Sequence, residues 1–204
     1  MDQTDYSVLP EKKRPLVQVV PLGNIDTVAI QVAAANLQSI LELPADILAP
    51  WPEPGYALVP ERGQYNAGPI LKALAEEIPP PLIRIGLTSL DLCLPILTFV
   101  FGEAQLGGRA AVVSYHRLAE GPLVESDHKD LTYERLAKIT VHETAHVLGL
   151  SHCRASGCLM RFSQSLEQLD SLSALFCDQC GYELERARKV MEAAQAAMAG
   201  GLEP

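Results

Sequence analysis

The stretch His142-Glu-Thr-Ala-His146-Val-Leu-Gly149-Leu-Ser-His152 brings three imidazoles and one carboxylate together in a short segment of the chain. Two histidines four positions apart on an α-helix emerge on the same face, one turn apart, and can hold one metal ion. Glu143 follows the first of them, so it can take a proton from water without binding the metal itself. Gly149 can adopt the left-handed conformation that ends a helix, which lets His152 turn back towards the same ion.

This pattern predicts a catalytic zinc site. Three protein ligands leave the fourth position of a tetrahedral zinc ion open for water, whose pKa falls from above 15 to about 7 when it is bound. A bare His-Glu-x-x-His is also compatible with an ordinary helix turn. The glycine and the third histidine at their offsets, with Met160 downstream, favour the metal site on His142, His146 and His152, with Glu143 as the catalytic base.

Four of the five cysteines follow in two pairs, Cys153 with Cys158 and Cys177 with Cys180. Thiolates at these spacings suit a closed, structural zinc site. Two disulfides, or buried thiols that bind no metal, are the alternatives. The chain opens Met-Asp-Gln-Thr-Asp-Tyr-Ser without the apolar segment of an export signal, so we expect a cytoplasmic protein in which disulfides are disfavoured. Cys93 lies outside both pairs and is expected to be a core thiol.

The segment from His142 to Cys180 resembles the archaemetzincins, a family of zinc metallopeptidases of the metzincin clan. The resemblance is carried by His-Glu-x-x-His-x-x-Gly-x-x-His with a cysteine directly after it, then Cys-x-Met, then Cys-x-x-Cys. Upstream, residues 99–104 and 111–118 resemble the paired strands that precede the active-site helix of that family. The resemblance implies a catalytic zinc on the three histidines, a second zinc on the four cysteines, Glu143 as general base and Met160 as the Met-turn beneath the metal.

Two features depart from related enzymes. Some metzincins carry a tyrosine two residues after the Met-turn methionine to stabilise the oxyanion, and this chain has Phe162 there, which leaves the oxyanion partner unassigned. Secreted metzincins carry a latency segment with a cysteine or aspartate that blocks the zinc. No such segment is recognised in this sequence, so no zymogen is expected.

The length and net charge of the chain limit its domain organisation and the kinds of partner it can bind. A chain of 204 residues suits one domain, and we predict a single metallopeptidase domain over 1–204 with two lobes. Residues 1–149 would form the lobe with the active-site helix, and 150–204 a small C-terminal lobe with the Met-turn and the four-cysteine zinc. The net charge of −9 argues against a nucleic-acid partner or an anionic membrane surface, and Pro95 breaks the longest apolar run, 92–101. A monomer is favoured.

Strand and helix signals alternate along the first half of the chain. Strands are predicted at 16–20, near 56–59 and at 82–86, and helices at 28–43, with Asp26 or Thr27 as the cap, and at 66–78, with Asn66 as the cap. The active-site helix is predicted from Asp130 or Thr132 to Gly149, apolar around most of its circumference and hence buried, and a last helix at 183–199. Together with the resemblance this predicts an α/β (α+β) fold, a metzincin-like mixed twisted sheet with backing helices.

Residues 97–101 and 109–115 are predicted strands, joined by a turn at 103–108 that contains two glycines. One of them should be a sheet edge. In metzincins an edge strand above the cleft pairs with an extended substrate, although a simple terminal strand is the alternative. Tyr115 and His116 follow the second strand, and either could face the cleft.

Three functions remain open from the sequence. The favoured one is a zinc-dependent metallopeptidase that hydrolyses peptide bonds through a zinc-bound water activated by Glu143. The alternative is a catalytically weak or inactive zinc protein that binds peptides with the same fold, which the complete set of histidines and the glutamate disfavours. The third, a nucleic-acid-binding zinc module, is disfavoured by the acidic charge. The sequence names neither a substrate nor a cleavage preference.

Overall fold

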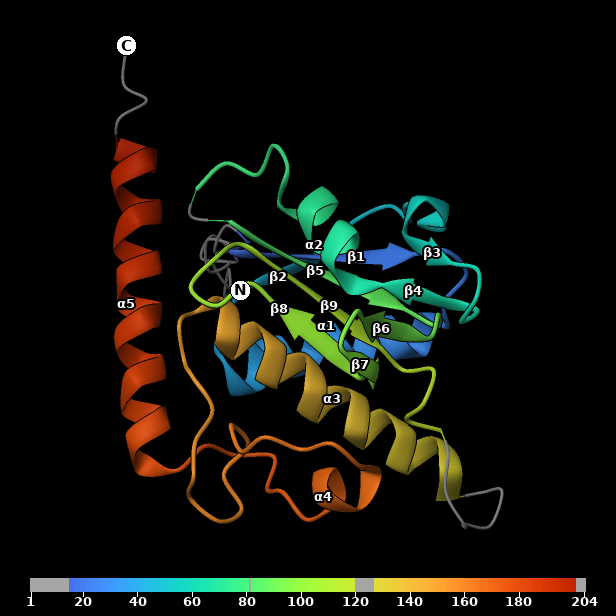
Figure 1. The fold of residues 1–204 in the computed structure, drawn as a ribbon. Coiled ribbons are helices and arrows are strands. Elements are labelled where there is room, and N and C mark those ends of the chain that lie inside the picture. Colours follow the sequence, from blue (N-terminus) through green and yellow to red (C-terminus); the bar gives the residue numbers. More distant parts are fainter. Residues whose placement is uncertain (1–14, 81, 120–126, 201–204) are drawn as a thin grey trace, which may run out of the picture.

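Two β-sheets with helices packed on them make up the computed structural model, which describes residues 15–80, 82–119 and 127–200 (Figure 1). The larger sheet has five strands in the order β2-β1-β5-β9-β8. Its first four strands run parallel, and β8 is antiparallel to β9 and forms one edge. The strands are β1 (Val17–Leu22), β2 (Ala45–Ile47), β5 (Ile83–Thr88), β8 (Gly102–Ala104) and β9 (Ala110–Ser114).

The central strands are buried on both faces, which is why most of their residues are apolar. Successive side chains of a strand point to opposite faces. In β9, Ala111 and Val113 therefore join the core cluster on one face of the sheet, while Ala110 and Val112 join the cluster on the other.

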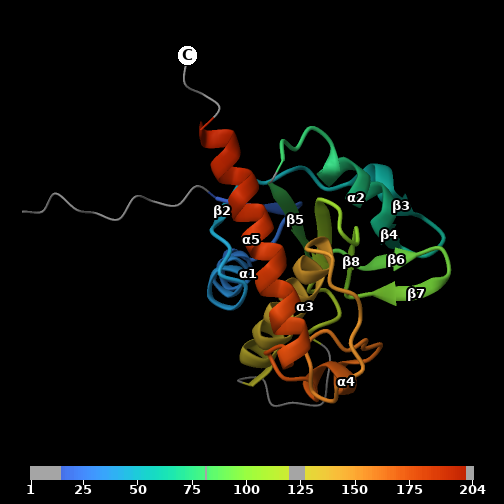
Figure 2. The same ribbon diagram turned by 90° about the vertical axis from the view of Figure 1, so that its left-hand side faces the viewer.

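Helices α1 (Thr27–Ile40) and α3 (Asp127–Val147) pack on one face of this sheet, and α2 (Ala67–Ala75) packs on the other (Figures 1 and 2). The predicted caps are confirmed, since Asp26 accepts from the Val28 N–H and Asn66 from the Gly68 N–H, each at 3.0 Å. Helix α2 ends three residues before the predicted boundary because Glu76 is extended, with φ −68° and ψ 138°, and Glu77 then takes a positive φ of 54°.

The smaller sheet has four strands in the order β3-β4-β6-β7. They are β3 (Leu58–Val59), β4 (Gln64–Asn66), β6 (Leu92–Leu94) and β7 (Leu97–Val100), and a 3-10 turn, η1 (Gly55–Ala57), precedes β3. The strand predicted at 97–101 is confirmed as β7, but the predicted hairpin with 109–115 is wrong: β7 pairs with β6, and β8, which lies partly in the predicted turn at 103–108, pairs with β9. The chain changes sheets at Phe101, whose side chain is buried in the core and whose carbonyl accepts from the Ser114 N–H at 2.8 Å, so pairing with β9 begins there and continues through β8.

The active-site helix is buried, as predicted, although α3 starts at Asp127, earlier than expected. After it come α4 (Leu166–Asp170) and α5 (Asp178–Gly200), which extends along one side of the molecule (red in Figure 1). Helix α5 begins earlier than the predicted residue 183, so its first turn includes Cys180. The fold is thus the predicted α/β (α+β) class with backing helices and a buried central helix. None of the described helices combines the length and the apolar character that a membrane span requires.

Candidate metal centre and active site

The three predicted histidine ligands meet at one point. His142 and His146 lie one turn apart on α3, and Gly149, with a φ of 96°, ends the helix and lets the chain reverse to His152. The Nε2 atom of His146 lies 3.0 Å from that of His142 and 3.2 Å from that of His152. The three nitrogen atoms thus form a cluster in which all lie within 4.8 Å of one another.

Hydrogen bonds on the far side of two rings fix which nitrogen faces this cluster. The Nδ1–H of His142 donates to the Leu159 carbonyl at 2.8 Å, and that of His146 donates to the Leu150 carbonyl at 2.6 Å. Each Nε2 then carries a lone pair. Two lone pairs 3.0 Å apart repel each other unless a cation lies between them, so the arrangement fits a metal ion.

The histidines are also in the protonation state that binds metal. The pKa of His142 is lowered to about 4, mainly by burial; the bond to Leu159 opposes this shift, and the charges of His146 and His152 contribute to it. Burial lowers the pKa of His146 and of His152 as well. Neutral imidazole is the ligand form, so near neutral pH all three rings are ready to coordinate zinc.

Glu143 lies directly beneath the edge strand β8. The pKa of its carboxyl is raised to about 8, mainly by burial and in smaller part by the charge of Glu103 on β8. The contact with the strand is tight, because a Cβ placed on Gly102 would lie 2.6 Å from the Glu143 Cγ. A glycine at this position therefore leaves the space that the Glu143 side chain occupies.

A cleft of about 530 Å³ opens over these residues, within the size range of ligand sites. Its upper rim is formed by β7, β8 and Leu106, and its opposite wall by Ser151, His152 and residues 162–164, with His142, Glu143 and His146 between them. Tyr115 and His116 do not line it, so that expectation is wrong. His116 instead lies with its Nδ1 atom 3.1 Å from the Ser89 carbonyl.

The segment that follows helix α3 supports the floor of the cleft. Met160 is fully buried, next to the Leu159 carbonyl that orients His142. The Phe162 ring lies with its centroid 4.9 Å from that of His152 and is half exposed in the cleft. Phe162 has no hydroxyl group, so it offers no hydrogen bond to an oxyanion.

The four paired cysteines form the second cluster, with their sulfur atoms within 4.8 Å of one another. They are free thiols. A hydrogen bond from the Cys180 backbone N–H is the main reason that the pKa of Cys177 is lowered to about 7, whereas burial raises the pKa of Cys158 and of Cys180. Four converging sulfurs around one point fit a tetrahedral zinc ion. Cys93 is buried apart from them, which confirms it as a core thiol.

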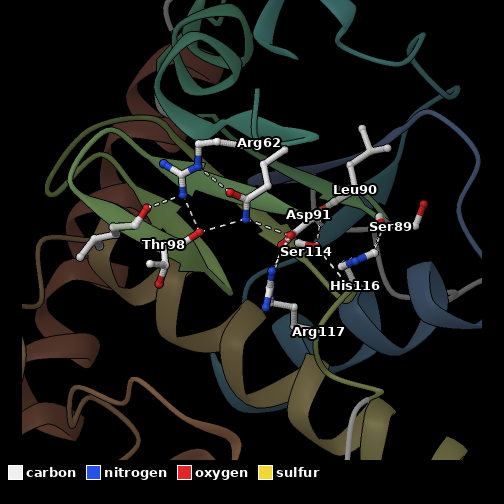
Figure 3. A network of polar contacts seen from close by, with 10 residues as sticks. Arg62, Ser89, Leu90, Asp91, Thr98, Ser114, His116 and Arg117 are labelled. Carbon is white, nitrogen blue, oxygen red and sulfur yellow. Dashed lines mark hydrogen bonds and ion pairs between the residues drawn. The ribbon is translucent and has the colours of Figure 1, made fainter. Parts of the chain in front are cut away.

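A polar network that the sequence did not indicate holds the upper rim in place (Figure 3). Arg62 donates to three carbonyls of the β6–β7 hairpin at 2.5 to 3.1 Å. Gln64 donates to the Thr98 carbonyl and to Asp91, each at 2.9 Å, and Asp91 forms a two-point ion pair with Arg117 at 2.6 and 2.7 Å. The interacting groups come from segments far apart in sequence, which is why no local pattern marks them.

A His-Glu-x-x-His helix, a third histidine after a glycine turn and an edge strand over the cleft define the class as a zinc metallopeptidase. Residues 62–186 match the model of Peptidase family M54. The archaemetzincin of Natronomonas pharaonis is 33% identical over 167 residues, which cover 80% of this chain and 96% of the relative. The chain belongs to Peptidase family M54.

Solved archaemetzincin structures share the fold. The structure from Archaeoglobus fulgidus, complexed with malonate, has a TM-score of 0.70 at 33% identity and covers 82% of this chain and 99% of its own. The structure from Methanopyrus kandleri has a TM-score of 0.73 at 31% identity and covers 89% of this chain and 99% of its own. The resemblance inferred from the sequence is therefore confirmed.

Proposed function

We propose that this peptidase holds its catalytic zinc on His142, His146 and His152 and uses Glu143 as the general base of peptide hydrolysis. The observation that carries the proposal is the convergence of the three Nε2 atoms, with two of them fixed by bonds from Nδ1 to backbone carbonyls. Such outer bonds orient histidine ligands and raise their basicity. When bound, the zinc ion polarises the scissile carbonyl and makes water a stronger nucleophile.

The chain's own residues then have distinct tasks. The edge strand β8 and the facing wall hold an extended peptide across the cleft. A cation held on the three histidines would favour the ionised form of Glu143 against the effect of burial. A carboxylate oxygen of Glu143 then accepts a proton from the attacking water and returns it to the leaving amine. The burial of Glu143 excludes bulk water from this transfer, and Gly102 lets the strand pass close above it.

We further propose a second, structural zinc on Cys153, Cys158, Cys177 and Cys180, and thus two zinc ions per chain. This fits an organisation of one domain in two lobes, 1–149 and 150–204. Contacts between the lobes support it, since Arg135 of α3 forms a two-point ion pair with Asp170 at 2.6 and 2.7 Å. The Met-turn role of Met160 belongs to the same proposal and rests on its full burial beside Leu159.

The experiment combines zinc analysis with hydrolysis of a diverse peptide library. We expect the parent to contain two zinc ions and to cleave peptides. Glu143→Ala keeps the three imidazoles, so it should retain zinc while hydrolysis falls by a factor of about 10² or more. His146→Ala should lose the catalytic zinc together with activity.

Two results would contradict this assignment. Cleavage that is indifferent to Glu143→Ala would come from a contaminating protease. A zinc-replete parent that binds peptides but cleaves none would instead support the alternative of an inactive peptide-binding protein.

A further inference from the structure

Strand β8 presents an open backbone edge at the cleft. Phe101 accepts a hydrogen bond from the Ser114 N–H, and the Gln105 N–H donates to the Ala110 carbonyl, at 2.8 and 3.0 Å. Bonding in an antiparallel ladder alternates along the strand. Gly102 and Ala104 therefore direct their N–H and C=O groups away from β9, where a peptide can pair with them.

The side chain between these two residues is Glu103. Side chains alternate along a strand, and the Cβ direction of Gly102 points at Glu143, so Glu103 points to the opposite face of the sheet. Its register partner Val112 packs in the core cluster on that same face. The Glu103 side chain thus lies at the upper rim of the cleft, above the backbone edge.

This carboxylate is half buried at the rim of the cleft. Among the residues that the structure describes, it has no hydrogen-bond or ion-pair partner. Burial raises its pKa, and its charge acts on the buried Glu143. A partly desolvated carboxylate is stabilised when a cation is placed beside it.

We propose that Glu103 makes the cleft selective for peptides that carry a basic side chain at the residue lying opposite it, an inference that rests on the proposed peptidase function. A peptide paired antiparallel to the free edge would bond with Gly102 and Ala104. Its residue across from Glu103 then forms a non-hydrogen-bonded pair, in which the two side chains lie closest. A lysine or arginine at that position meets the unpaired carboxylate, and the net charge of −9 also favours the approach of basic peptides.

The test uses a neutral peptide that the zinc-loaded parent cleaves. Lysine and its uncharged analogue norleucine are placed at each position in turn, and kcat/KM is measured for each pair. At one position the parent should prefer lysine by about two- to fivefold, the range of a cross-strand charge pair. The ratio should approach one in Glu103→Gln, and Glu103→Lys should prefer a glutamate peptide. Glu61→Gln, which removes an exposed carboxylate outside the cleft, should keep the parental ratio.

The outcome separates this inference from the peptidase assignment. A parent that cleaves neutral and lysine peptides equally well overturns the role of Glu103 and leaves the peptidase intact, as does a lysine preference that persists in Glu103→Gln. If the parent cleaves nothing, the proposed hydrolysis fails, and the same lysine-to-norleucine ratio is measured as peptide affinity by fluorescence anisotropy. If Glu103→Gln brings the lysine-to-norleucine affinity ratio to about one, the inference is supported. If the ratio stays at the parental value, the inference is refuted.

Discussion

Gly102→Ala tests how closely the edge strand fits the catalytic base. The added methyl carbon would lie 2.6 Å from Cγ of Glu143 and 3.0 Å from its Cδ and Oε1. Ordinary carbon contacts are about 3.5–4.0 Å, so the Glu143 side chain must move by roughly 1 Å. A displacement of that size at a reacting group lowers the rate by about 10²-fold.

The cost in stability should be much smaller. Only the end of one side chain has to move, and Gly102 does not have a positive φ, so the backbone accepts alanine. Overpacking of this kind costs about 1 kcal/mol, or about 2–4 °C in Tm for a domain of this size.

The assay measures kcat on one library-derived peptide, together with zinc content and Tm. Gly55→Ala is the matched control, because no atom lies within 4 Å of its added Cβ, and it should behave like the parent. We expect Gly102→Ala to keep its zinc and melt close to the parent while kcat falls by about 10²-fold. A variant with parental kcat would refute the tight placement of Glu143, and loss of zinc or a large fall in Tm would show that the methyl group disrupts more than the base.

Two other perturbations test the supports of the site. Cys177→Ser should lower the zinc content by one ion per chain and reduce both Tm and activity, because metal binding by thiolates is coupled to folding; a variant that melts like the parent with all its zinc contradicts the structural role. Asp91→Asn weakens the ion pair with Arg117 and should cost about 1–2 kcal/mol near neutral pH. Burial raises the Asp91 pKa, but hydrogen bonds from Arg117 and Gln64 and nearby positive charge outweigh it and lower the pKa overall. Because the pKa of Asp91 is lower in the folded state than its unfolded value of about 3.9, the ionised carboxylate stabilises the fold above that pH, and this stabilisation is lost as the pH falls below it. The difference in unfolding free energy between parent and Asp91→Asn, measured by urea unfolding, should therefore shrink from pH 6 to pH 3. A difference that stays constant contradicts this linkage.

Local patterns identified the three histidines that the structure brings together, because their spacing in the sequence is short. Histidines one turn apart share a helix face in any helix, and a glycine after them permits the turn to His152 that the φ of 96° at Gly149 confirms. The two cysteine pairs were also close in sequence. Their gathering into one cluster depends on contacts between their segments, such as the Leu159 N–H bond to the Leu175 carbonyl at 3.0 Å.

The parts that the sequence missed depend on distant contacts. The apolar run 97–101 does form a strand, β7, but the sequence predicted that it joins 109–115 in a hairpin; β7 pairs with β6 and β8 pairs with β9 in the other sheet, which no local signal reports. Because β7 and β8 belong to different sheets, Glu103 lies on β8 at the cleft, while the Arg62 network holds β7. The sequence signal available was the glycine-glutamate pair after Phe101, since a glycine inside a strand marks a close approach of another group.

The two clusters share the loop that follows α3, so the position of one affects the other. His152 is followed directly by Cys153, whose N–H donates to the Met160 carbonyl at 2.7 Å. Leu159, which orients His142 through its carbonyl, directly follows Cys158. The position of the four sulfur atoms therefore helps to place His152, a proposed zinc ligand. It also helps to place the Leu159 carbonyl, which orients His142, another proposed ligand. Since the loop has little regular structure of its own, a zinc ion on the proposed four-cysteine site would give the histidine cluster a rigid base.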